Sequence, residues 1–178
     1  MFRILILSLV LILSACNKKA VEAPPSPQSL TEEAVGHYCG MNVLEHPGPK
    51  GQILLANHIM PVWFSSARDA FAFTMMPEEA KDIRAVYVSD MGTAESWENP
   101  GADNWIDAHK AYFVIESNLR GGMGAPETVP FSDRAAADKF VAEHGGRVVD
   151  FASVPQDYVL GSETEAPLNT DASAGHVH

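Results

Sequence analysis

The chain has 178 residues, of which 46% are hydrophobic, and it carries a formal net charge of −11 at pH 7. This length is enough for one domain or two small ones. The acidity argues against a nucleic-acid partner, because a surface of this charge repels phosphate groups.

The first residues resemble a bacterial lipoprotein signal peptide. Arg3 precedes an apolar run over residues 4–13, which is too short to span a bilayer but suits a signal-peptide core. The run ends in Leu13-Ser14-Ala15-Cys16, which resembles a lipobox. We expect cleavage after residue 15 and acylation of Cys16, which anchors the chain in membrane lipid. An ordinary signal peptide with an incidental cysteine is the alternative.

Processing also bears on charge, location and redox chemistry. Removal of residues 1–15 takes away Arg3 and changes the formal charge from −11 to −12. Asn17 is not the aspartate that usually retains lipoproteins at the inner membrane, so we expect an outer-membrane anchor facing the periplasm. Acylation of Cys16 leaves Cys39 as a lone thiol in an oxidising compartment, where it is a liability unless it has a function.

Polar segments flank the central part of the chain. Residues 16–33 are polar and proline-rich, as in Pro24-Pro25-Ser26-Pro27, and predict a flexible lipidated tether after the signal peptide of residues 1–15. Residues 161–178 predict a disordered tail.

The central part contains an apparent duplication. Val62-Trp63-Phe64-Ser65 recurs 67 residues later as Val129-Pro130-Phe131-Ser132. Each block follows a strand-like run, precedes a helix-like stretch and is completed by a second strand-like run. In the first copy the strand-like run is 52–55, the helix-like stretch 65–73 and the second run 85–88. In the second copy the corresponding segments are 111–115, 132–143 and 147–151. Ser65 and Ser132 are the expected helix N-caps. The pattern predicts an α+β chain of two tandem ββαβ units, residues 34–97 and 98–160, although a match this short can also arise by chance.

Three sulfur atoms lie in loop-like contexts rather than in the apolar runs. Cys39-Gly40-Met41 places a thiol and a thioether two residues apart, and Met123 lies within Gly121-Gly122-Met123-Gly124. Thiolate and thioether are soft ligands, which at low coordination number select Cu(I) over harder ions. His46 is near enough in sequence to add a nitrogen ligand. The alternative for Cys39 is a buried structural thiol.

The other soft or nitrogen ligands have simpler explanations. Met60, Met75, Met76 and Met91 are interpreted as packing or surface residues, and His37 and His58 as structural. His176 and His178 belong to the solvated tail, where they can bind a divalent metal only loosely. A structural zinc site is not expected, because it needs four Cys or His ligands at close spacing and Cys39 is the lone thiol. The sequence also has neither the GxSxG motif of serine hydrolases nor a phosphate-binding glycine loop.

At these residues the chain resembles the NosL family of copper-binding lipoproteins. The similar stretches span about residues 38–151 in order: Tyr38-Cys39-Gly40-Met41, His46-Pro47-Gly48-Pro49-Lys50-Gly51-Gln52-Ile53, Phe64-Ser65-Ser66-Ala67-Arg68-Asp69-Ala70, Trp105-Ile106-Asp107-Ala108, Gly122-Met123-Gly124, Pro130-Phe131 and Gly145-Gly146-Arg147-Val148.

The resemblance implies a fold of two ββαβ units, distantly related to organomercurial lyase. It implies binding of Cu(I) and its delivery for the copper–sulfide centre of nitrous-oxide reductase, through a membrane ABC-type assembly complex. Cys39, Met41 and Met123 then become the candidate ligands. Relatives often place a histidine two residues after the methionine, where this chain has Ala125, so His46 is taken as the nitrogen ligand instead.

Three functions therefore remain open. The leading one is a metallochaperone without catalysis. The second is a thiol enzyme of the organomercurial-lyase type, which in that family uses more than one thiol, whereas Cys39 is alone. The third is a structural envelope lipoprotein, which leaves Cys39 and Met123 without explanation.

Overall fold

The computed structural model describes residues 23–161. The predicted cleavage site, Cys16 and the tail histidines lie outside these residues. The elements, in chain order, are η1 (Val43–Glu45), β1 (Gly51–Leu55), β2 (Val62–Phe64), α1 (Ala67–Met75), β3 (Ile83–Ser89), β4 (Trp105–Asp107), η2 (Ala108–Lys110), β5 (Tyr112–Ile115), β6 (Val129–Phe131), α2 (Arg134–His144), β7 (Arg147–Asp150), η3 (Phe151–Ser153) and α3 (Gln156–Leu160).

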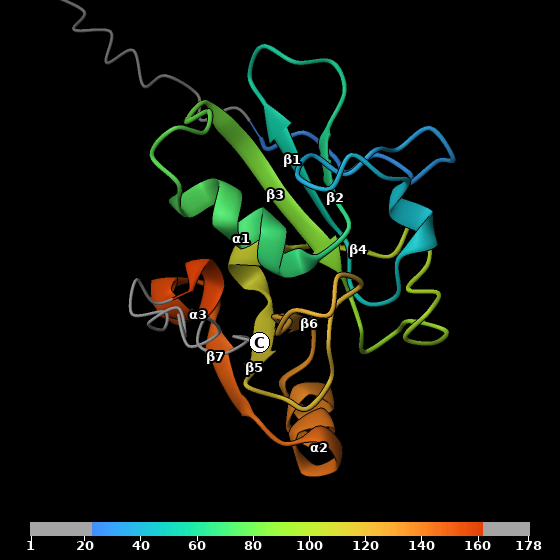
Figure 1. Ribbon diagram of the computed structural model, residues 1–178, viewed down its shortest axis with the longest axis vertical. Coiled ribbons are helices and arrows are strands. Elements are labelled where there is room, and N and C mark those ends of the chain that lie inside the picture. Colours follow the sequence, from blue (N-terminus) through green and yellow to red (C-terminus); the bar gives the residue numbers. More distant parts are fainter. Residues whose placement is uncertain (1–22, 162–178) are drawn as a thin grey trace, which may run out of the picture.

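The described strands form two antiparallel sheets, ordered β2-β1-β3-β4 and β6-β5-β7. In both, the first strand of the unit lies between the strand that precedes the helix and the strand that follows it. The predicted α+β fold with two ββαβ units is therefore confirmed, and Figure 1 shows the second unit, with α2, below the first. The offset of 67 residues holds for the strand before each helix and for the helix start, since Val62–Phe64 and Val129–Phe131 are β2 and β6, and α1 and α2 begin at Ala67 and Arg134.

The predicted N-caps are one residue too early. The α1 cap is Ser66, whose hydroxyl accepts from the backbone N–H of Arg68, and the α2 cap is Asp133. Ser65 and Ser132 precede the caps and bond elsewhere: Ser65 Oγ lies 3.5 Å from Cys39 Sγ, and Ser132 donates to Asp90. In both copies two adjacent residues carry a suitable oxygen, and the second of them caps the helix.

The predicted boundary between the units also needs correction. Trp105–Asp107, assigned from the sequence to the second unit, forms β4 and pairs with β3 of the first sheet. The first sheet is thus extended by β4, a strand that comes after the first unit in the sequence. Pro130 is accommodated because β6 is an edge strand, where a missing N–H breaks no bond to a further strand.

The largest hydrophobic cluster joins the two units. Phe71 of α1 packs edge-to-face on Phe113 of β5, with ring centroids 4.8 Å apart, and stacks on Phe151 at 4.6 Å. The same cluster includes Phe64 from the first unit and Val159 from α3. Aromatic packing of this kind fixes the two units relative to each other, so loops from both can build one site.

Residues 25–30 differ from the predicted tether. Tyr87 donates from its hydroxyl to the Pro25 carbonyl at 2.8 Å, and Gln28 and Gln52 exchange two hydrogen bonds of 2.8 and 2.9 Å. Leu30 is buried in a small cluster that includes Trp63. This part of the predicted tether is therefore held against the first sheet.

No helix among residues 23–161 is long and apolar enough to cross a membrane.

Candidate metal centre

Cys39 lies in a tight loop before the first sheet. The Gly36 N–H donates to the Met41 carbonyl at 2.9 Å and the Gly40 N–H to the Gly36 carbonyl at 2.8 Å, while Gly40 has a φ of 66°. The thiol sits directly over Gly36, where a Cβ atom would lie only 2.6 Å from the sulfur. Gly36 thus makes room for the half-buried thiol, and Met41 remains exposed beside it.

The second sulfur loop lies between β5 and β6. The Gly121 N–H donates to the Ala125 carbonyl at 3.0 Å, and the Gly124 N–H to the Gly121 carbonyl at 2.8 Å. These bonds close a small loop that presents Met123 with 55% of its surface exposed. A thioether this open is available to a metal ion, and its exposure argues against a packing role.

His46 lies beneath this second loop. A Cβ atom at Gly122 would be 2.5 Å from the His46 Cβ and 3.1 Å from its Nδ1, so the absence of a side chain at Gly122 lets the two segments meet. The histidine is only 8% exposed, and its Nε2 has no hydrogen-bond partner among the described residues. A buried nitrogen without a partner costs about 1–3 kcal/mol, so a ligand that occupied it would restore lost stability.

Both sulfur loops reach the amino end of α1. Cys39 Sγ lies 3.5 Å from Ser65 Oγ, and a Cβ atom at Gly121 would lie 3.8 Å from Oγ of the adjacent residue, Ser66. The structure thus brings the loops of Cys39, Met41 and Met123 to one end of one helix, with His46 packed under the second loop.

A buried carboxylate joins the two units at this point. Glu127 accepts hydrogen bonds from the Ser66 hydroxyl at 2.8 Å and from the backbone N–H of Arg68 at 2.9 Å. It also packs against Gly121, where a Cβ atom would lie 2.5 Å from Glu127 Oε2. Glu127 therefore holds the Met123 loop against the start of α1.

Two titratable groups are buried below the loops. Burial raises the pKa of Glu127 from 4.5 to about 7, against the opposing effect of its hydrogen bonds from Arg68 and Ser66. Burial lowers the pKa of Lys50 to about 8, against the opposing charge of Glu127. The Lys50 ammonium donates to the His46 carbonyl, which fixes the backbone at that histidine.

The raised pKa of Glu127 has a defined effect on folding stability. A carboxyl group with a higher pKa in the folded state binds its proton more tightly when folded. The stabilisation is complete below about pH 4.5 and is lost as the pH rises through about 7. A shift from 4.5 to about 7 corresponds to about 3 kcal/mol.

The remaining candidates from the sequence are placed elsewhere. Met75 and Met76 pack against the main core, Met91 packs against the cluster of the second unit, and Met60 is 63% exposed. The His37 ring packs edge-on against Phe64 and Phe73 at 5.9 and 5.4 Å, and His58 is exposed.

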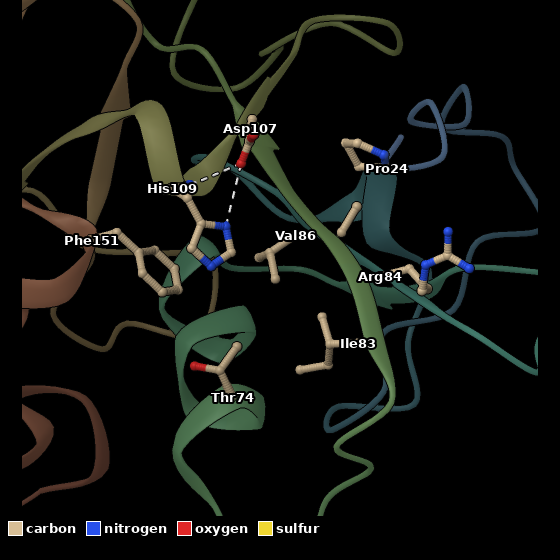
Figure 2. A pocket seen from close by; sticks show the side chains of 9 residues that line it. Pro24, Thr74, Ile83, Arg84, Val86, Asp107, His109 and Phe151 are labelled. Atoms are coloured by element: carbon tan, nitrogen blue, oxygen red, sulfur yellow. Dashed lines mark hydrogen bonds and ion pairs between the residues drawn. The ribbon is translucent and has the colours of Figure 1, made fainter. Parts of the chain in front are cut away.

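A separate hollow lies between β3 and α1 and is lined by none of the sulfur ligands. This cavity has a volume of about 290 Å³. Asp107, which lines it, accepts from the backbone N–H of His109 at 3.0 Å and lies 3.4 Å from its Nδ1. Figure 2 shows both residues at the cavity. Thr74 and Phe151 line other sides. The candidate metal centre is thus not this cavity but an open surface site.

Ligand chemistry narrows the kind of metal that the centre can hold. Within residues 23–161, no cluster of three or more His, Cys, Asp or Glu side chains has the arrangement of a metal site. The segments that meet near the start of α1 instead carry one thiol, two thioethers and one imidazole as candidate ligands. Such a set is typical of a site for a soft ion.

Three residues that support these ligands were not predicted to belong to the site. Gly36 makes room for the thiol, Ser65 lies beside it, and Glu127 joins the loops. The spacing of Gly36 from Cys39 is a local signal, but the link from Glu127 to Ser66 crosses 61 residues.

The fold and site together define a small α+β protein of two docked ββαβ units, with an open, sulfur-rich candidate metal centre where loops from both units meet. The sequence profile of the NosL family matches residues 27–159, and the chain belongs to this family.

Individual relatives agree with this assignment. The copper-binding lipoprotein NosL of Achromobacter cycloclastes is 47% identical over 169 residues, covering 92% of this chain and 87% of that protein. Its namesake in Stutzerimonas stutzeri is 32% identical over 174 residues, covering 92% and 90%. The crystal structure of the copper chaperone NosL from Shewanella denitrificans superposes with a TM-score of 0.70 at 34% identity, covering 75% of this chain and 98% of that one.

Proposed function

We propose that this protein is a lipid-anchored carrier of Cu(I), with Cys39, Met41, Met123 and His46 as the metal ligands. The observation that carries the proposal is the meeting of both sulfur loops at the amino end of α1. Three sulfur ligands and one imidazole favour a soft monovalent copper ion. The copper-binding and chaperone names of the relatives support the same metal.

Exposure of the sulfur ligands supports transfer rather than storage. Met41 and Met123 are 39% and 55% exposed, so an acceptor can approach the ion and replace these ligands one at a time. The half-buried Cys39 and the buried His46 would keep their hold until later in the exchange. The proposed role involves no catalytic step, in keeping with relatives named for binding and chaperoning.

His46 is the nitrogen ligand in this proposal. Its Nε2 is buried and has no hydrogen-bond partner in residues 23–161, and its ring lies under the loop that carries Met123. A copper ion bound there would satisfy the nitrogen and join the first unit to the second.

The anchor and the acceptor complete the proposal. Acylation of Cys16 would hold the protein at the outer membrane, facing the periplasm, and the lipoprotein names of the relatives support such an anchor. Confinement to a membrane surface raises the effective concentration of donor and acceptor. The acceptor would be the ABC-type complex that assembles the copper–sulfide centre of nitrous-oxide reductase.

The test is an anaerobic titration of the mature chain with Cu(I) against a competing chelator. His176→Ala and His178→Ala are introduced in every sample to remove binding by the tail. We expect one Cu(I) per chain, much weaker binding of Zn(II), and a large loss of affinity in Cys39→Ser. Equal affinities for Cu(I) and Zn(II), or unchanged Cu(I) binding in Cys39→Ser, would contradict the proposal.

A further inference from the structure

The loop between β1 and β2 exposes two large apolar side chains that neither the core nor the candidate metal centre uses. Ile59 is 91% exposed and Met60 is 63% exposed. The loop, Ala56-Asn57-His58-Ile59-Met60-Pro61, contains no Asp, Glu, Lys or Arg in a chain of net charge −11. The Asp82 carboxylate accepts from the Asn57 amide at 3.2 Å, at the start of the loop. The exposed apolar tip at Ile59 and Met60 is suited to contact with an apolar surface.

The described chain begins beside this loop. Ala23, Pro25 and Gln28 line a shallow hollow together with His58 and Ile59. Gln28 also donates from its side-chain amide to the Ile59 carbonyl at 3.0 Å. Figure 1 shows the loop and the first described residues at the same upper end of the molecule.

The length of the intervening chain limits how far this loop can lie from the anchor. Residue 23 follows the predicted acylated Cys16 by seven positions. A chain of seven residues spans at most about 25 Å. Lys18 and Lys19 fall in this short stretch and would be attracted to anionic lipid headgroups. An anchored Cys16 therefore keeps the β1–β2 loop close to the bilayer.

We infer that Ile59 and Met60 insert into the interface of the lipid bilayer as a second membrane contact beside the acyl anchor. The inference rests on the proposed acylation of Cys16. Apolar side chains at a loop tip add to the binding of a lipid anchor because each removes further apolar surface from water.

This contact would orient the metal centre. β1 leads from Gly51 to Leu55 at the loop end, and at its other end Gly51 pairs with Phe64, the residue before Ser65. Ser65 lies beside Cys39. The four steps from Gly51 to Leu55, at about 3.4 Å each, separate the two ends by about 14 Å. A loop held in the bilayer thus turns the Cys39 end away from the membrane, where a partner can reach it.

The test places the mature, lipidated full chain in vesicles of phosphatidylethanolamine and phosphatidylglycerol whose acyl chains are brominated. Ile59→Trp reports on the loop, and Leu44→Trp, at a residue 46% exposed near the metal centre, is the matched control. The signal of the parent chain, with its three native tryptophans, is subtracted. We expect at least twofold stronger quenching at position 59 than at position 44.

A second measurement uses the native side chains. Backbone hydrogen exchange over residues 56–61 should slow several-fold when the acylated chain is placed in vesicles, and Ile59→Ser/Met60→Ser should remove this protection. Equal quenching at both positions, or unprotected exchange in a chain shown by mass spectrometry to be acylated, overturns the inference and leaves the anchor intact. An unmodified Cys16 overturns both.

Discussion

Replacing Met123 with alanine tests whether the second unit contributes a ligand. The side chain is 55% exposed, so less than half of its surface is buried by the fold. Full burial of a methionine contributes about 1.5–3 kcal/mol, which puts the expected loss of folding stability near 1 kcal/mol. For a domain of this size, that corresponds to a fall in Tm of about 2–4 °C.

The effect on metal binding should be larger. Changes to the ligand environment of a metal site typically reduce affinity about 10–100-fold. Such a loss equals about 1.4–2.8 kcal/mol of binding free energy. Because the protein without metal stays folded, the change can be assigned to the site rather than to the fold.

The assay is a competitive Cu(I) titration together with a thermal melt of the metal-free protein. Met60→Ala is the matched control, since Met60 is 63% exposed and lies in the β1–β2 loop, away from the centre. We expect Met60→Ala to bind Cu(I) as the wild type does. The reasoning is refuted if Met123→Ala also retains wild-type affinity.

Three further perturbations test the surroundings of the centre. Gly36→Ala places a Cβ atom 2.6 Å from Cys39 Sγ, so it should displace the thiol and weaken Cu(I) binding about tenfold in the same titration; unchanged affinity would show that the thiol is free to move. Glu127→Gln removes a carboxyl group with a pKa of about 7. The free energy of unfolding of the wild type, measured in urea, should fall between pH 4.5 and pH 8 by about 3 kcal/mol more than that of Glu127→Gln. Equal falls in the two proteins would refute the raised pKa. Ser66→Ala removes the α1 cap and a hydrogen bond to Glu127, and should destabilise the protein by about 1–3 kcal/mol, more than Ser65→Ala does; the reverse order in urea unfolding would contradict the cap assignment.

The fold could be predicted where the signal is local. The apolar runs that form β1 and β5 and the helix-like stretches that form α1 and α2 are visible in the sequence itself, and the repeat at 67 residues indicated that one pattern occurs twice. The exact caps depended on a choice between adjacent oxygens, such as Ser65 and Ser66, which only the geometry of the helix start decides.

Features that depend on distant contacts were not predictable. Trp105–Asp107 is too short to stand out as a strand, and it forms because β3 offers a free edge. Residues 25–30 have the composition of a polar linker, yet the Gln28 backbone forms two hydrogen bonds with the side chain of Gln52, 24 residues away.

The candidate site divides in the same way. Cys39 and Met123 are soft ligands that lie beside glycines, and this pattern alone predicted a site for a soft metal ion. The role of Glu127 could not be predicted, because it depends on contacts with Ser66 and Arg68 some 60 residues away. His46 was favoured by its position in sequence, and its buried Nε2 without a partner gives that choice a structural reason.

X-ray absorption spectroscopy at the copper edge tests the central claim most directly, namely that one Cu(I) ion is bound by ligands from both units. In the wild type we predict one reduced copper ion with three sulfur neighbours and one nitrogen neighbour, from Cys39, Met41, Met123 and His46. Met123→Ala should remove one sulfur neighbour and His46→Ala the nitrogen. A copper environment of nitrogen and oxygen alone, or a spectrum unchanged by Met123→Ala, would contradict the account.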